Sequence, residues 1–196
     1  MSYVTQILNW ISDSLLLPVI VLLLATLAAS LVSLGGFCSN YLALLRERRK
    51  HRELLGKIRS GIVPTCAELE YGGVFAEHVA GLVERNWNAL ECEKFIAEYE
   101  SECERELDRS RFLVKVAPML GLMGTLIPMG PALAGLASGD IANMAYNMRI
   151  AFATTVVGCV CAGISLLIYT VKRHWYVEEV ADLRYVLDRH LEEERR

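Results

Sequence analysis

Three long apolar stretches without a charged side chain divide this sequence. They cover residues 14–45, 116–139 and 150–171. About 20 apolar residues are enough for a helix to cross a bilayer, so each stretch predicts one transmembrane helix. The apolar centre of the first stretch runs from Leu15 to Leu34. The hydropathy pattern therefore predicts a protein that crosses the membrane three times.

The first stretch has a second interpretation, because it lies near the N-terminus. A cleaved signal peptide would begin with basic residues and would contain a shorter apolar core. This sequence has no Lys or Arg before Arg46, and its apolar run is longer than a signal core. A retained transmembrane helix is the better interpretation, and a signal peptide is the alternative.

A polar region with helical periodicity, residues 46–112, separates the first two stretches. It opens with a basic segment, and a break containing Gly and Pro is predicted between Gly61 and Gly73. From Val74 onward, apolar residues recur at spacings of three and four, which predicts a buried helix face. The clearest members of this face are Cys92, Phe95, Ile96, Tyr99, Cys103 and Leu107. No stop signal lies between Leu107 and Val116, so we expect this helix to continue into the second apolar stretch.

The opposite face of this helix is acidic, which is typical of a face exposed to water. Its members are Glu91, Glu93, Glu98, Glu100, Glu102, Glu104 and Glu106. The C-terminal segment is also amphipathic, and its apolar seam has a spacing of roughly 3.5 residues, which suits packing against neighbouring helices. The seam consists of Tyr176, Val180, Leu183, Leu187 and Leu191.

No alternating pattern typical of a strand is convincing anywhere in the sequence. The predicted fold is all-α, a polytopic membrane protein with three transmembrane helices and long cytoplasmic helical extensions. We expect an N-terminal segment with the first transmembrane helix at 1–45 and a cytoplasmic helical region at 46–112. The second and third transmembrane helices should form a pore region at 113–172, and a cytoplasmic C-terminal helix should occupy 173–196.

Basic residues flank the apolar stretches unevenly. Directly after the first stretch come Arg46, Arg48, Arg49, Lys50, Arg52, Lys57 and Arg59. Lys172 and Arg173 follow the third stretch, whereas Arg149 is the only basic residue between the second and third. The positive-inside rule places the N-terminus outside and both the middle region and the C-terminus in the cytoplasm. We therefore expect a multi-pass protein of the inner (cytoplasmic) membrane, whose basic cluster also suits contact with anionic lipid head groups.

The sequence offers no constellation typical of an enzyme. Its histidines, His51, His78, His174 and His190, are scattered, and it has no phosphate loop and no nucleophile elbow. The six cysteines form no C-x-x-C pair, and none would be extracellular in the predicted topology. We therefore predict no catalytic function, no metal site and no cofactor. The lack of a basic surface argues against a nucleic-acid partner, whereas the formal net charge of −3 does not indicate any class of partner.

Small and helix-breaking residues in the second apolar stretch suggest more than an anchor. Gly121 and Gly124 thin one helix face, so that another helix can approach closely. Pro128 and Pro131 each remove a backbone donor and should kink the helix. Freed carbonyls within a bilayer need a new partner, and the hydroxyl of Thr125 lies one turn before Pro128. The alternative is that Thr125 only bonds back to its own helix.

The third stretch repeats this composition with Thr154, Thr155 and Gly158. Adjacent residues on a helix point about 100° apart, so the two threonines cannot face one pore equally. No Asp, Glu, Lys, Arg or His lies inside any of the three stretches. Proton carriers normally need an ionisable group within the membrane. If this chain conducts protons, the carboxylate must come from a second protein.

Two runs in these stretches resemble a known family. They are APMLGLMGT at residues 117–125 and, about thirty residues later, AFATTVVG at residues 151–158. Together they resemble the MotA/TolQ/ExbB proton-channel family over about residues 112–172. The three-span layout is most similar to the TolQ/ExbB branch, whereas the run in the third stretch is more similar to the flagellar-stator branch.

This resemblance implies a pentamer around a dimer of a one-span partner similar to ExbD, TolR or MotB, whose membrane Asp carries the ion. Carried over to this sequence, it implies that Thr125 and Thr155 line the ion path. Gly121, Gly124, Pro128, Pro131 and Gly158 would shape and pack the pore helices. Many ExbB and TolQ members have a Glu near the outer start of the third span, where this sequence has Ile150 beside Arg149.

The leading hypothesis is an ion-conducting stator subunit that converts proton or sodium motive force into mechanical work. A different hypothesis is a membrane scaffold that recruits partners through its cytoplasmic helices, with the acidic face as its binding surface. A small transporter subunit fits less well, because the sequence shows no pair of broken-helix repeats.

Overall fold

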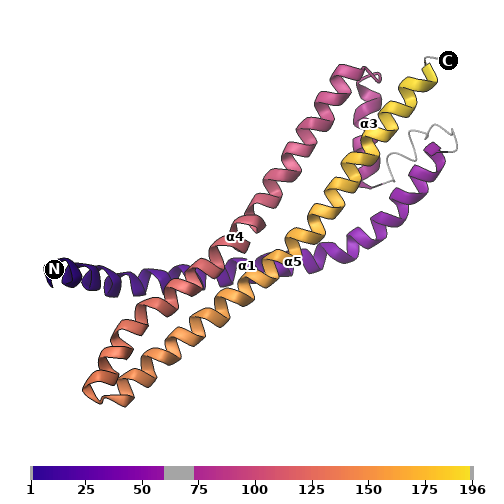
Figure 1. Ribbon diagram of the computed structural model, residues 1–196. Helices are drawn as coiled ribbons and strands as arrows, with labels where there is room; N and C mark the ends of the chain where they lie inside the picture. Colours follow the sequence, from indigo (N-terminus) through magenta and orange to yellow (C-terminus); the bar gives the residue numbers. More distant parts are fainter. Residues whose placement is uncertain (1, 60–72, 195–196) are drawn as a thin grey trace. The chain divides into compact units, whose positions relative to one another are not determined.

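The computed structural model describes residues 2–59 and 73–194 of the 196-residue chain. Within these residues it contains four helices, α1 (Ser2–Arg59), α3 (Val74–Glu84), α4 (Ala89–Ser138) and α5 (Ile141–Glu194) (Figure 1). The described residues contain no strand, which confirms the all-α prediction. The break predicted at residues 61–73 lies outside the described residues, apart from Gly73 at the start of α3.

Three helices are long and apolar enough to cross a membrane, which confirms the predicted number. They are α1 at Ser14–Ser39, α4 and α5. The 50 residues of α4 and the 54 of α5 correspond to roughly 75–80 Å, more than twice the hydrocarbon thickness of about 30 Å. Each helix must therefore continue outside the membrane. The uninterrupted α4 also confirms that no break lies between Leu107 and Val116.

The chain divides into two compact units. Unit 1 consists of Met1–Gly35 and Arg109–Tyr169, and unit 2 consists of Gly36–Asp108 and Thr170–Arg196. Both α4 and α5 contribute to each unit. Unit 1 therefore contains most of the apolar stretches, and unit 2 contains the amphipathic segments.

Large apolar side chains from α3, α4 and α5 form the core of unit 2. They are Phe75, Ala76, Val79, Leu82, Cys92, Ile96, Val180, Leu183, Val186 and Leu187. Leu82, Ile96 and Leu183 are almost completely buried. The two apolar seams predicted from spacings of three and four thus supply much of this core.

A strained turn joins α3 to α4 in unit 2. Asn86 and Trp87 have φ angles of 49° and 55°, in the left-handed region that bulky residues rarely adopt. The Trp87 ring stacks on His190 with the ring centroids 4.0 Å apart, a contact that holds it in place. Asn88 then caps α4, because its side-chain oxygen accepts the N–H of Leu90 at 3.1 Å.

A short turn reverses the chain between α4 and α5 in unit 1 (Figure 1). Gly139 has a φ of 78°, which glycine adopts without a steric penalty. Asp140 then caps α5, since its carboxylate accepts the N–H of Asn143 at 3.0 Å. As a result, the parts of α4 and α5 within unit 1 lie side by side and antiparallel.

Candidate functional site

Glycines bring the backbones of α4 and α5 into direct contact in unit 1. A Cβ added to Gly158 would lie 2.8 Å from the carbonyl oxygen of Ala117 and 3.0 Å from the Cα of Gly121. The Cβ position of Gly124 meets the side chain of Thr154 instead, at 2.7 Å. We call the line formed by Gly121, Gly124, Thr154 and Gly158 the glycine seam. Close approach through small residues is the usual way in which transmembrane helices pack, because lipid gives no hydrophobic driving force between helices.

The two neighbouring threonines of α5 have different environments. Thr154 lies in the glycine seam and is only 7% exposed. Thr155 is exposed at the edge of the seam, where its Cα lies 3.6 Å from the Cβ position of Gly121. This difference follows from the rotation of about 100° between adjacent helix residues. The sequence alone could not decide which threonine faces α4.

Thr125 and Thr155 lie within about 3 Å of each other along the axis of the α4–α5 pair. Each follows a residue of the Gly124–Thr154 contact by one position, which is about 1.5 Å along its helix, and the two displacements are opposite because the helices are antiparallel. Each is also rotated from that contact by about 100° in the same sense. An antiparallel helix pair has a local two-fold axis perpendicular to its plane, so equal rotations reach the same face. Both hydroxyl-bearing residues therefore emerge on one face of the pair.

Both hydroxyls donate to carbonyl oxygens of their own helix. Thr125 Oγ1 bonds to the carbonyl oxygen of Leu122 at 2.7 Å, and Thr155 Oγ1 bonds to that of Ala151 at 3.2 Å. The back-bonding considered as an alternative for Thr125 is thus what the structure shows. A hydroxyl that donates one hydrogen bond still has lone pairs for a water or a cation. Back-bonding therefore orients these oxygens without using up their capacity as acceptors.

Three prolines, Pro118, Pro128 and Pro131, lie within α4, and the helix continues through all of them. Pro128 is buried and Pro131 is half-buried. Each removes the donor for the carbonyl four residues earlier, which for Pro128 is that of Gly124. The carbonyl oxygen of Gly124 is therefore an acceptor that Pro128 leaves free, and it lies beside Thr125 and close to the level of Thr155. The sequence analysis gave no role to Pro118, which lies next to the seam contact of Ala117.

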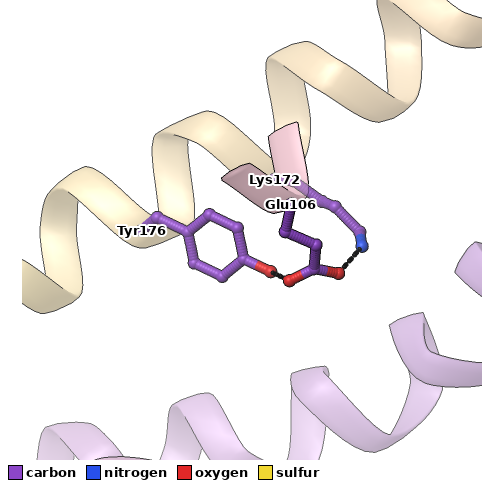
Figure 2. A network of polar contacts seen from close by, with 3 residues as sticks. All are labelled: Glu106, Lys172 and Tyr176. Atoms are coloured by element: carbon purple, nitrogen blue, oxygen red, sulfur yellow. Dashed lines mark hydrogen bonds and ion pairs between the residues drawn. The ribbon is translucent and has the colours of Figure 1, made fainter. Parts of the chain in front are cut away.

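Unit 2 contains polar contacts between α4 and α5 that the periodicity did not predict. Glu106 accepts hydrogen bonds from the Nζ of Lys172 at 2.6 Å and from the hydroxyl of Tyr176 (Figure 2). Arg184 Nη2 lies 2.5 Å from Glu100 Oε2. Burial, together with the bond to Glu106, raises the pKa of the Tyr176 hydroxyl. Part of the acidic face therefore holds α5 in addition to facing water.

A second polar group lies inside unit 2, around His78 of α3. Its Nδ1 lies 3.3 Å from Oε1 of Glu179, and both atoms are buried without a hydrogen bond. The two side chains are thus within ion-pair distance but not in hydrogen-bond geometry. The ring of Tyr99 packs against His78 with the ring centroids 4.0 Å apart. Cys103 belongs to the same group through Tyr99 and Glu179, and burial raises the pKa of its thiol to about 11. Sequence spacing gave no signal for this group, because its members come from three helices.

Neither unit contains an obvious metal centre within the part of the chain that the structure describes. No three His, Cys, Asp or Glu side chains of residues 2–59 and 73–194 come together as metal ligands. The polar groups around His78 and Glu106 are pairs or include tyrosine and lysine, which suits helix contacts. The face of unit 1 that carries Thr125 and Thr155 is therefore the candidate functional site, and we call it the hydroxyl face.

Comparison with protein families bears directly on this site. The model of the MotA/TolQ/ExbB proton channel family matches residues 71–184, more than half of the chain. The chain belongs to this family. The matched residues include α3, α4 and most of α5, and with them the whole glycine seam and both threonines of the hydroxyl face. Comparison with curated protein sequences gave no match.

Membership in the MotA/TolQ/ExbB family confirms the resemblance predicted from residues 117–125 and 151–158, and the match extends well beyond them. It implies a membrane protein with a proton-channel role in energy transduction. The family is one of channels and not of enzymes. The assignments of Thr125 and Thr155 to an ion path, and of the chain to the TolQ/ExbB branch, stay predictions.

Proposed function

We propose that this chain is the ion-conducting stator subunit of a membrane motor that converts proton motive force into mechanical work. It acts with a one-span partner similar to ExbD, TolR or MotB, which supplies a membrane Asp. Five copies of the chain surround a dimer of that partner in the inner membrane. The N-terminus lies outside, and the basic residues after the first span lie in the cytoplasm.

The observation that carries this proposal is the hydroxyl face of unit 1. Thr125 and Thr155 emerge within about 3 Å of each other along the axis and on one face of the α4–α5 pair, beside the carbonyl freed by Pro128. These groups can solvate a moving ion but cannot hold a proton. The apolar stretches of this chain contain no Asp, Glu, Lys, Arg or His. A carboxylate from a partner would complete the path, because proton carriers normally use an ionisable group within the membrane.

The energy available from such a path is adequate for a mechanical step. One elementary charge that crosses a potential of 100 mV releases about 2.3 kcal/mol. Exposed ion pairs contribute about 0–1 kcal/mol each. The passage of one proton can therefore bias the exchange of several weak helix contacts in one direction.

The composition of the complex provides the first test. We would extract it gently from its own membranes and determine its mass by native mass spectrometry. Five copies of this chain with two copies of a smaller one-span protein would support the proposal and would identify the partner. A monomer or dimer without such a partner would contradict it.

The second test removes the hydroxyls. The complex carrying Thr125→Val and Thr155→Val should assemble but lose ion flux in liposomes, because valine keeps the shape of threonine and removes the oxygen. Thr26→Val is the matched control, since Thr26 of α1 also bonds back to its helix, at 2.8 Å from the carbonyl oxygen of Leu23. Unchanged flux in the double variant would remove the pore assignment. It would favour the scaffold, which should instead fail when Glu102 and Glu104 are changed to Lys.

A further inference from the structure

The tightest side-chain contact of the glycine seam joins Gly124 to Thr154. A Cβ added to Gly124 would lie 2.7 Å from both the Cβ and the Oγ1 of Thr154, and 3.0 Å from its Cγ2. The Thr154 side chain therefore rests on the bare backbone of α4. The nearby contact between Gly121 and Gly158 involves no side chain. It limits the distance between the helices but offers little resistance to rotation or sliding.

Thr154 is held in a single conformation. Its side chain is β-branched, which restricts the χ1 angle in a helix. Its hydroxyl lies 2.9 Å from the carbonyl oxygen of Ala151 and 3.1 Å from that of Ile150. The side chain is also buried between the two helices. Thr154 is therefore a stiff projection, and the missing side chain of Gly124 provides the space into which it fits.

We propose that Thr154 is a positioning residue, which fixes the rotation and register of α5 against α4 through its contact with Gly124. It thereby directs Thr155 to the face that carries Thr125. A slip of one residue would rotate α5 by about 100°, so that Thr155 would take the place of Thr154 in the seam and Thr154 would move to the side opposite to Thr125. This inference rests on the proposed ion path, but the geometry of the contact can be tested apart from ion flux.

Complementary size changes at the contact test this role in the reconstituted complex. Gly124→Ala should lower ion flux per assembled complex by about tenfold to hundredfold, since a misplacement of about 1 Å can cost that much. Adding Thr154→Gly removes all three atoms that the new methyl group would meet, the Cβ, Oγ1 and Cγ2 of Thr154, and should restore most of the flux. Gly130→Ala is the matched control, because nothing lies within 4 Å of the Cβ position of Gly130.

A shape-conserving variant separates positioning from direct ion contact. Thr154→Val keeps the branched shape and removes the hydroxyl, so it should retain nearly the flux of the original chain. Thr155→Val should lose flux. The positioning role is wrong if Thr154→Val is as damaging as Thr155→Val, or if Thr154→Gly does not rescue Gly124→Ala.

A direct measurement of register decides the question without ion flux. Spin labels can be placed at Leu122 and Phe152, which are exposed on α4 and α5. Unnatural amino acids would carry them, because the chain has six native cysteines, and labelled chains would be diluted with unlabelled ones. The distance within the labelled chain should shift in Gly124→Ala and return in the double variant. An unchanged distance in Gly124→Ala would overturn the positioning role, whereas flux unaffected by Thr125→Val with Thr155→Val would overturn only the ion path.

Discussion

The two units pack parts of the same two helices by opposite means. In unit 1, α4 and α5 meet through Gly121 and Gly158, while a large side chain such as Leu122 is 59% exposed. In unit 2, the same helices meet through fully buried side chains such as Leu183 and through ion pairs such as Arg184 with Glu100. In lipid there is no hydrophobic driving force for burying a leucine between helices, so close backbone contact holds membrane helices together. In water the burial of large apolar groups is favourable.

This contrast predicts opposite sensitivities to side-chain volume. Unit 1 should be damaged by adding atoms to the seam, because backbone atoms already touch there. Unit 2 should be damaged by removing atoms from its core, because cavities in a packed core are costly.

The largest effect is expected from Leu183→Ala in the core of unit 2. Leu183 is completely buried, and truncation of a buried leucine costs about 2–5 kcal/mol. The measurement is the free energy of unfolding of the complex, followed through the sensitivity of unit 2 to protease. Leu122→Ala in unit 1 is the control and should have little effect. Equal losses in the two variants would show that the contrast between the units is wrong.

A smaller loss is expected from Gly158→Ala in unit 1. The new methyl group would lie 2.8 Å from the carbonyl oxygen of Ala117, which belongs to the backbone and cannot turn away. Overpacking of this kind costs roughly 1–3 kcal/mol. Gly163→Ala is the matched control, because nothing lies within 4 Å of its Cβ position. Thermal unfolding of both variants in the same detergent should separate them, and equal melting temperatures would argue against a tight seam.

The ion pairs of unit 2 should contribute less to the free energy of unfolding than the packing of Leu183 or Gly158. Glu106→Gln weakens the contact with Lys172. The side chain of Glu106 is 53% exposed and that of Lys172 is 24% exposed. Solvent screening limits such a pair to about 1 kcal/mol or less. Glu98→Gln removes the more exposed pair with Lys94 and should cost almost nothing. A loss for Glu106→Gln that did not shrink in high salt would mean that the contact acts through packing and not through charge.

An effect of a different kind, which depends on pH, is a loss of stability of unit 2 in alkali. Burial raises the pKa of Cys103 from 9.0 to about 11, so at pH values between these the unfolded chain binds fewer protons than the folded one. This contribution is complete below pH 9 and is lost as the pH rises toward 11. Cys103→Ala should flatten the fall in melting temperature over this range, and removal of the exposed Cys38 should not. A slope unchanged in Cys103→Ala would attribute the effect to Tyr99 and Tyr176, whose pKa values are also raised.

Periodicity was sufficient to predict the long helices and about half of the core of unit 2. The seams containing Ile96 and Leu183 recur every three or four residues, so their burial could be predicted from spacing alone. The family also followed from short runs of small residues and hydroxyls. These features are local, and a single sequence displays them directly.

Contacts between distant residues were not predictable in this way. The sequence shows Thr154 and Thr155 side by side, but only the rotation of α5 decides which one meets Gly124. The His78–Glu179 pair joins residues about a hundred positions apart, and no spacing rule connects them. The turn at Asn86 and Trp87 contains no glycine, so no signal in the sequence would predict its left-handed backbone.

The antiparallel arrangement of α4 and α5 gives this hairpin two unlike sides. Residues one position after the Gly124–Thr154 contact are Thr125 and Thr155, whereas those one position before it are Met123 and Ala153. By the same two-fold geometry, the latter pair emerges on the opposite side, where both are exposed and apolar. In the proposed ring of such hairpins, these two sides would distinguish the lumen from the surrounding lipid without a charged side chain. The difference between the sides comes from the residues directly before and directly after the Gly124–Thr154 contact.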